Sequence, residues 1–292
     1  MLGISSEKAL YGTMEIIIAE KAGFCFGVKR AIDITFEISN EMREGVYTYG
    51  PLIHNPQVIE KIKQSGINPT DDLYSPAIKT LIIRTHGIPP EIYHEISKIG
   101  YTLIDATCPF VKKAQQYAEK LKKDGYQVVI VGDKEHPEVQ GLIGFAGDGV
   151  VVVNHEESLP PLKKKVGLIV QTTQRFETFR NIAIKVISSA REVKINNTIC
   201  DYTAMRVKET RDLAARVDVF IVAGGKNSAN TTQLAALSTK VCNNVYHIET
   251  SDELQEGWFR GIEKVGITGG ASTPEWIIQD VEKKIREISL RR

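Results

Sequence analysis

The 292-residue sequence predicts an α/β protein built from three similar small units, each with a mainly parallel sheet. Short apolar runs alternate with segments of helical periodicity along the chain, which is typical of parallel sheets covered by helices. Continuous runs such as Val128–Val131 and Val219–Val222 favour strands that are buried on both faces. Three of the four cysteines, Cys25, Cys108 and Cys200, recur at intervals of 83 (108 − 25) and 92 (200 − 108) positions. This spacing suggests one α/β unit used three times.

The individual strands are predicted where β-branched and apolar residues cluster between turn residues. They are Met14–Ala19, Val46–Gly50, Thr80–Thr85, Thr102–Ala106, Gln127–Gly132, Val150–Val153, Lys165–Gln171, Val193–Ile199, Val217–Ala223, Val245–Ile248 and Lys264–Thr268. Helices are predicted where apolar residues recur at helical spacing with polar residues on the other side. The helices argued in this way are Pro90–Lys98, Val111–Asp124, Phe176–Ser188 and Ala204–Val217.

Composition and charge exclude several classes of protein. The chain is 42% hydrophobic and 25% charged, and its 37 basic and 36 acidic residues give a net charge of +1. No overall field therefore attracts nucleic acid or a membrane surface, and neither is expected as a partner. No apolar run approaches the ~20 residues of a membrane span, and no basic and apolar leader opens the chain, so a cytoplasmic protein is expected. In that reducing compartment four cysteines do not suggest disulfides.

Cys25, Cys108 and Cys200 each lie where a predicted strand ends and a helix begins. Because helix N-termini lower the pKa of thiols, all three are expected to favour the thiolate. Since ligands collect at the carboxyl ends of parallel strands, the three thiolates are expected to converge on a metal site. Three independent thiols are the alternative. Cys242 precedes a strand without this context and is interpreted as a packing residue.

Three thiolates are an unusual ligand set. Zinc normally takes a fourth protein ligand or a water, and iron–sulfur clusters are normally held by four cysteines. A [4Fe–4S] cluster with three protein ligands would have one open iron, which could act as a Lewis acid beside an electron store.

Other polar residues that follow strands suggest a phosphate site. His54, His86 and His136 each come just after a predicted strand, and imidazoles can donate to phosphate oxygens. The loops 223–231 and 268–274 combine glycines and hydroxyls with the start of a helix, which suits an anion, although a plain helix cap explains them equally well. Glu138 and the hydroxyl of Thr172 could carry protons, but Glu138 could also be a surface residue. His94, His155 and His247 are interpreted as surface residues.

Eight motifs in chain order, with all three cysteines, closely resemble the family of 4-hydroxy-3-methylbut-2-enyl diphosphate reductases. The resemblance runs from about Met14 to the C-terminus and leaves residues 1–13 uncovered. The motifs are Gly23-Phe24-Cys25-Phe26-Gly27-Val28, Leu52-Ile53-His54-Asn55, Thr85-His86-Gly87, Asp105-Ala106-Thr107-Cys108-Pro109, His136-Pro137-Glu138-Val139, Gln171-Thr172-Thr173, Lys226-Asn227-Ser228 and Gly270-Ala271-Ser272-Thr273-Pro274.

The resemblance implies a trefoil of three α/β domains around a central cavity. It implies a first domain at 27–108, a second at 109–199 and a third at 200–288, with residues 14–26 pairing with the third. It further implies a [4Fe–4S] cluster and assigns roles to individual residues. The implied cluster ligands are Cys25, Cys108 and Cys200; the implied substrate-binding residues are His54, His86, His136, Thr172, Ser228, Ala229, Asn230 and Ser272; the implied catalytic residues are Glu138, Thr172 and His136.

The implied activity is the reductive dehydroxylation of an allylic diphosphate to isopentenyl and dimethylallyl diphosphate, the last step of the non-mevalonate isoprenoid pathway. No Gly-x-Gly-x-x-Gly follows a strand, so electrons are expected from a ferredoxin- or flavodoxin-like partner. Two departures from the family pattern stand out: Ala229 replaces a common serine, and Val207 a common glutamine. The alternatives are an iron–sulfur hydro-lyase acting on a small phosphorylated substrate, which would need no reductant, and a non-enzymatic iron–sulfur or phosphate-binding regulator.

Overall fold

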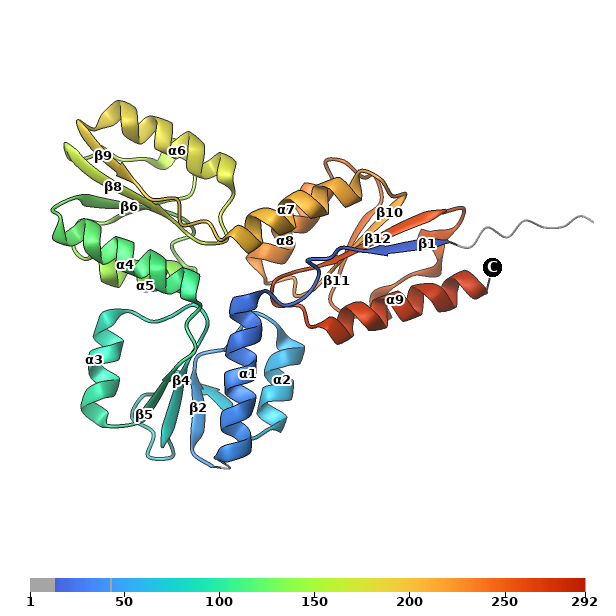
Figure 1. Ribbon diagram of the computed structural model, residues 1–292, viewed down its shortest axis with the longest axis horizontal. Helices are drawn as coiled ribbons and strands as arrows, with labels where there is room; N and C mark the ends of the chain where they lie inside the picture. The colour runs from blue at the N-terminus through green and yellow to red at the C-terminus, as the bar shows by residue number, and fades with distance from the viewer. Residues whose placement is uncertain (1–13, 43, 292) are drawn as a thin grey trace, which may run out of the picture.

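A computed structural model describes residues 14–42 and 44–291 of the chain (Figure 1). Over these residues, three separate four-stranded parallel sheets form three lobes around a common centre. This arrangement confirms the predicted α/β class with parallel sheets. Within the described residues, no helix combines the length and the apolar character that crossing a membrane requires.

The first sheet has the strand order β3-β2-β4-β5, and every pair of neighbours is parallel. Its elements, in chain order, are α1 (Phe26–Glu41), β2 (Val46–Tyr49), α2 (Pro56–Gln64), β3 (Asn68–Thr70), β4 (Thr80–Ile83), α3 (Pro90–Ile99) and β5 (Thr102–Asp105). Strand β3 was not predicted. It is a three-residue edge strand that contains Pro69 and no other apolar residue, so it lacks the pattern by which strands are recognised.

The second sheet repeats this order as β7-β6-β8-β9, again with parallel neighbours. Its elements are α4 (Pro109–Lys123), β6 (Gln127–Val131), α5 (Pro137–Ala146), β7 (Val151–Val153), the 3₁₀ turn η1 (Glu156–Ser158), β8 (Lys165–Val170), α6 (Phe176–Ser189) and β9 (Glu192–Ile195). Strand β9 ends earlier than predicted, because the chain leaves regular pairing at Asn196. Thr198 still bonds to both backbone groups of Val170 on β8.

The third sheet has the order β1-β12-β10-β11 and is completed by the N-terminal strand. Its elements are β1 (Glu15–Ile18), α7 (Asp201–Ala214), β10 (Val219–Ala223), α8 (Ala229–Ser238), β11 (Val245–Ile248), the 3₁₀ turns η2 (Ser251–Glu253) and η3 (Glu256–Phe259), β12 (Lys264–Gly269) and α9 (Glu275–Leu290). Strand β1 pairs with β12 as β5 pairs with β4 and β9 with β8. The domain boundaries given above remain predictions.

This common strand order places the site. In each sheet the chain reverses its direction of winding between the two central strands, and ligands of parallel sheets bind at such switch points. The central pairs are β2 and β4, β6 and β8, and β10 and β12. The strand beyond each pair (β5, β9 or β1) leads to a helix of the next lobe, and the N-terminal ends of α4, α7 and α1 meet at the centre of the trefoil (Figure 1).

Buried apolar residues on both faces of the sheets hold each lobe together. In the third lobe, one cluster includes Val219, Ile221 and Val265, and a second on the opposite face includes Phe220 and Val222. Cys242 lies in this second cluster at 6% exposure, as expected for a packing residue. Because both faces of each sheet are covered, each lobe has its own apolar core.

Candidate functional site

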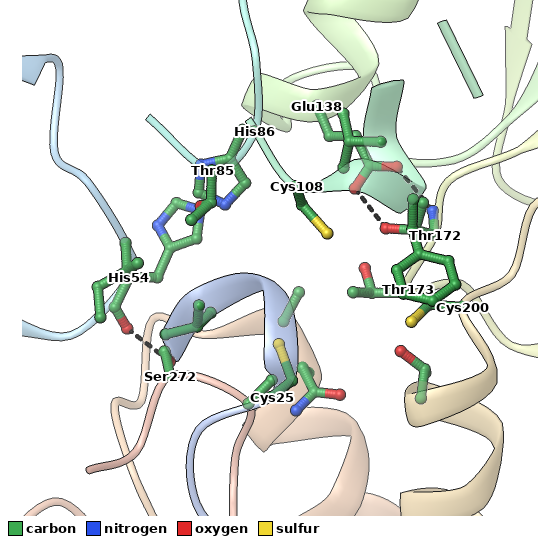
Figure 2. A pocket seen from close by; sticks show the side chains of 18 of the residues that line it. Cys25, His54, Thr85, His86, Cys108, Glu138, Thr172, Thr173, Cys200 and Ser272 are labelled. Atoms are coloured by element: carbon green, nitrogen blue, oxygen red, sulfur yellow. Dashed lines mark hydrogen bonds between the residues drawn. The ribbon is translucent and has the colours of Figure 1, made fainter. Parts of the chain in front are cut away.

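All the residues predicted for the site line one cavity of about 110 Å³ at the centre of the trefoil. They come from all three lobes and are Cys25, His54, His86, Cys108, His136, Glu138, Thr172, Cys200, Ser228, Ala229, Asn230 and Ser272. Figure 2 shows the thiols of Cys25, Cys108 and Cys200 around a common space, with Glu138 and Thr172 on one side and His54 and His86 on another. Val207 lies outside this lining, in a groove formed with α6 and α8.

The three cysteines hold equivalent positions, since each is the residue that precedes the first turn of a helix. Cys25 precedes α1, Cys108 precedes α4, and Cys200 precedes α7. Close packing joins two of these turns: a Cβ atom on Gly27 would lie 2.5 Å from Cys108 Sγ. Only glycine therefore allows the start of α1 to approach Cys108 so closely.

The expected lowering of thiol pKa is wrong for two of the cysteines. The pKa of Cys108 is raised to about 11, chiefly by burial and to a lesser extent by neighbouring Cys25 and Cys200, against backbone hydrogen bonds at the helix N-terminus that lower it. Burial likewise raises the pKa of Cys200. Desolvation of an anion thus outweighs the helix terminus, and three thiolates in one buried space repel one another. A cationic centre between them would remove both costs.

The chemistry of this donor set fits an iron–sulfur cluster better than a single ion. Among the described residues, the imidazoles of His54, His86 and His136 form the one group of three potential metal ligands within 4.8 Å of one another. The three cysteine sulfur atoms therefore do not all lie within 4.8 Å of one another. A zinc ion with Zn–S bonds of about 2.3 Å would need sulfur atoms roughly 4 Å apart.

The three histidines form a compact cluster that offers unused hydrogen-bond donors. The ring centroids of His54 and His86 are 4.5 Å apart, and His136 lies 5.5 Å and 5.3 Å from them. His136 Nδ1 accepts from Glu138 N at 3.2 Å, so its proton is on Nε2. His54 Nε2, His86 Nδ1 and Asn230 Nδ2 are buried without a hydrogen-bond partner among the described residues. Such groups are costly unless a ligand satisfies them.

The surroundings of these imidazoles favour their neutral form. Burial lowers the pKa of His54, lowers that of His136 to about 4, and takes that of His86 well below its usual range. The Arg84 guanidinium lowers all three pKa values further. A multiply charged anion would reverse this effect by favouring the imidazolium form.

The loops that start α8 and α9 complete this side of the cavity. Ser228 caps α8 by accepting from Thr231 N at 3.4 Å, and Ser272 donates to the backbone oxygen of His54 at 3.1 Å. Figure 2 shows the second bond, which joins the third lobe to the first. Ala229 is the first residue of α8, where it offers a backbone N–H without a hydroxyl.

Glu138 is buried, at 2% exposure, which rules out the surface alternative. Its carboxylate accepts from Thr172 N at 2.7 Å and from Thr172 Oγ1 at 2.8 Å (Figure 2). Burial raises the pKa of Glu138 to about 7, although both bonds from Thr172 lower it. A carboxyl group with this pKa can hold and release a proton near neutrality.

No sequence pattern predicted a role for two arginines near the site, Arg84 behind the histidines and Arg206 beside the cysteines. Arg206 lines the cavity and donates to the backbone oxygen of Gly269. The expectation of a surface position holds for His94 and His155, which are exposed. His247 is half-buried, and its Nε2 lies 2.9 Å from the backbone oxygen of Gly224.

Taken together, the fold and the cavity define a class: a three-lobed α/β protein that presents three thiols and a buried carboxyl group opposite a set of anion donors. The sequence profile of the LytB protein family matches residues 16–286, and the chain belongs to that family.

Relatives of nearly equal length support this assignment. The chain is 45% identical over 278 residues to the 4-hydroxy-3-methylbut-2-enyl diphosphate reductase of Pelobacter propionicus, with 94% of this chain and 99% of the relative covered. It is 47% identical over 280 residues to the same-named protein of Aquifex aeolicus, with 94% and 97% covered.

Solved structures give the same result. A structure of (E)-4-hydroxy-3-methyl-but-2-enyl diphosphate reductase, described as the terminal enzyme of the non-mevalonate pathway, has a TM-score of 0.73 at 45% identity and covers 94% of this chain and 99% of its own. The E-1-hydroxy-2-methyl-but-2-enyl-4-diphosphate reductase of Plasmodium falciparum has a TM-score of 0.86 at 27% identity and covers 93% and 87%.

Proposed function

We propose that this chain reductively removes the hydroxyl group of 4-hydroxy-3-methylbut-2-enyl diphosphate to give isopentenyl and dimethylallyl diphosphate. One observation carries the proposal: a single cavity sets three cysteine thiols opposite unpartnered imidazole and amide donors, with the buried Glu138–Thr172 pair beside them. The names of the relatives agree with the chemistry of these groups. The reaction consumes two electrons and two protons and releases water.

Cys25, Cys108 and Cys200 are proposed to hold a [4Fe–4S] cluster. When bound, such a cluster supplies electrons one at a time and leaves one iron without a protein ligand. The three thiols lie in one buried space and repel one another when ionised, so their own electrostatics favour a cationic centre. We propose that electrons reach it from a separate ferredoxin- or flavodoxin-like donor.

The opposite side of the cavity is proposed to bind the diphosphate. His54, His86 and Asn230 would satisfy their buried polar groups on phosphate oxygens, and His136 would donate from Nε2. Ser228 and the N–H of Ala229 lie at the start of α8, where unsatisfied N–H groups favour anions, and Ser272 lies in the loop that leads to α9. Holding the charged end here turns the hydroxymethyl end toward the cysteines, because both sets of residues line one small cavity.

Glu138 is the proposed proton source. Its pKa of about 7 lets it carry a proton at neutral pH, and Thr172 Oγ1, 2.8 Å away, can pass that proton on by exchanging donor and acceptor roles. His136 belongs to both halves of the site, because it contacts Glu138 N through Nδ1 and faces the other histidines.

The test is anaerobic purification followed by iron and sulfide analysis, with turnover measured in the presence and absence of a reduced dye. The proposal expects about four iron and four sulfide per chain and products only with the reductant. Turnover without a reductant would identify a hydro-lyase instead. A colourless, iron-free protein that still binds diphosphate would favour the phosphate-binding regulator.

A further inference from the structure

Arg206 is a buried cation in the wall of the cavity. Its side chain is 3% exposed, and it projects from the second turn of α7, the helix that Cys200 precedes. Among the described residues that line the cavity, it is the one lysine or arginine. Its guanidinium donates to the backbone oxygen of Gly269, which leaves most of its N–H groups for other partners.

No carboxylate pairs with this guanidinium within 4 Å over the described part of the chain. Glu209, the carboxylate whose charge acts on Arg206, is engaged elsewhere: its two oxygens accept from Glu20 N at 2.6 Å and from Lys21 N at 2.9 Å. A buried charge without a counter-charge costs several kcal/mol. Arg206 therefore needs a negative partner that the carboxylates do not supply.

The cysteines are the remaining source of negative charge. Arg206 lines the same cavity as all three cysteines. Burial lowers the pKa of Arg206, and the negative charges of Cys25, Glu209 and Cys200 oppose this shift, with Cys25 the strongest. Two of the three cysteines thus act on Arg206 from different helices. An arginine at this point acts as a fixed cation, because the guanidinium group is not deprotonated in proteins.

Building on the proposed function, we infer that Arg206 is the buried counter-cation of the cluster held by Cys25, Cys108 and Cys200, and that it favours the cluster's reduced state. Accepting one electron from an external one-electron donor makes the thiolate-bound centre more negative and breaks no bond. A fixed positive charge nearby, in a region shielded from water, stabilises that state more than the oxidised one. The net charge around a cluster is one of the factors that set its reduction potential.

A purely structural role for Arg206 makes a different prediction. The bond to Gly269 ties α7 to the end of β12, just before the loop that carries Ser272. Losing it would disturb packing and diphosphate binding, but it would not by itself change the ease of reducing the cluster. The reduction potential, measured without substrate, separates the two roles.

The test compares the wild type with Arg206→Lys, Arg206→Met and the control Arg211→Met, all loaded with cluster without oxygen. Lysine keeps the charge, methionine keeps only the apolar bulk, and Arg211 is an exposed residue on the same helix. The readout is the fraction of reduced cluster at a series of applied potentials, followed by electron paramagnetic resonance. We expect Arg206→Met to lower the ratio of reduced to oxidised cluster at least tenfold at fixed potential, about 59 mV for one electron.

In the same titration, Arg206→Lys and Arg211→Met are expected to stay within threefold of the wild type. Equal potentials for Arg206→Met and the wild type would overturn the inference. If Arg206→Met retains too little iron to titrate, retention of iron by Arg206→Lys alone supports the counter-cation. Equal iron loss in both, with equally lowered melting temperatures of the metal-free proteins, points to packing and overturns it. A wild type that binds no iron rejects the proposed function itself.

Discussion

Replacing Glu138 by glutamine tests the proton source directly, because the change keeps the size of the side chain and removes the proton. The cluster and the diphosphate donors should be unaffected, since among the described residues the Glu138 carboxylate bonds to Thr172 alone. Turnover should fall by about 10²–10⁴, the usual effect of losing a positioned general acid.

The raised pKa also predicts how activity depends on pH. With a pKa of about 7, half of the Glu138 side chains carry the proton at pH 7. In the wild type, kcat/KM should fall about tenfold for each pH unit above this value, because the active form is the protonated one. The residual activity of Glu138→Gln should lack this decline.

The same shift predicts an effect on stability, with a definite sign. A carboxyl group whose pKa rises from 4.5 to about 7 on folding binds its proton more tightly in the folded protein. Its contribution to the free energy of unfolding is fully present below pH 4.5 and is lost as the pH rises through 7; the loss amounts to about 3 kcal/mol. The metal-free Glu138→Gln variant should therefore gain stability relative to the wild type over this range.

The assay is product formation between pH 5.5 and 9 with a saturating concentration of reduced dye, so that electron supply does not limit the rate. Glu177→Gln is the matched control, since Glu177 also lies in the first turn of a helix but is exposed. A Glu138→Gln rate within threefold of the wild type, with an unchanged pH profile, would refute the proposed role of Glu138. Thr172 with a bound water would then be the next candidate for the proton donor.

Three further predictions concern the two sides of the cavity. Alanine at Gly27 should reduce the iron content several-fold, because its Cβ would lie 2.5 Å from Cys108 Sγ. Alanine at Gly257, where a Cβ would meet no atom within 4 Å, should leave the iron content unchanged. Equal iron contents in the two variants would contradict this prediction. Asn230→Ala should raise KM about tenfold with an unchanged cluster spectrum, since one donor to the diphosphate is lost. An unchanged KM would count against the proposed diphosphate site. Inorganic pyrophosphate should bind the substrate-free protein more tightly at pH 6 than at pH 8. The surroundings of the three histidines lower their pKa values, and a bound anion raises them again by favouring the charged form. Calorimetry that shows no pH dependence of binding would contradict this.

Local sequence patterns were sufficient to predict the strand-end positions of the site residues. Apolar runs mark the strands, and a cysteine or histidine just after such a run must lie at the carboxyl edge of a parallel sheet. The pairing of β1 with β12 joins residues far apart in the chain, so no local pattern predicts it. The resemblance to the family implied that residues 14–26 pair with the third domain but named no partner strand. Strand β3 was not predicted, because Pro69 and its polar neighbours have the composition of a turn.

Electrostatics in the interior were harder to predict. The helix N-termini at Cys108 and Cys200 correctly indicated donors to sulfur, but the depth of burial, which decides the sign of the pKa shift, is a property of the whole fold. Arg84 and Arg206 look like ordinary surface arginines in the sequence. Arg206 is 3% exposed and lines the central cavity, and this depth of burial is a property of the whole fold.

The central claim is that one cavity joins a reducing metal centre to a diphosphate site, and the most direct test is the number of electrons consumed for each molecule of product. Anaerobically purified protein is mixed with an excess of 4-hydroxy-3-methylbut-2-enyl diphosphate and a limiting, known amount of dithionite, with a dye that carries electrons to the protein. The account predicts one molecule of isopentenyl or dimethylallyl diphosphate for every two electrons consumed, and no product from the oxidised protein. Product formed without loss of electrons, or electrons lost without product, would contradict it.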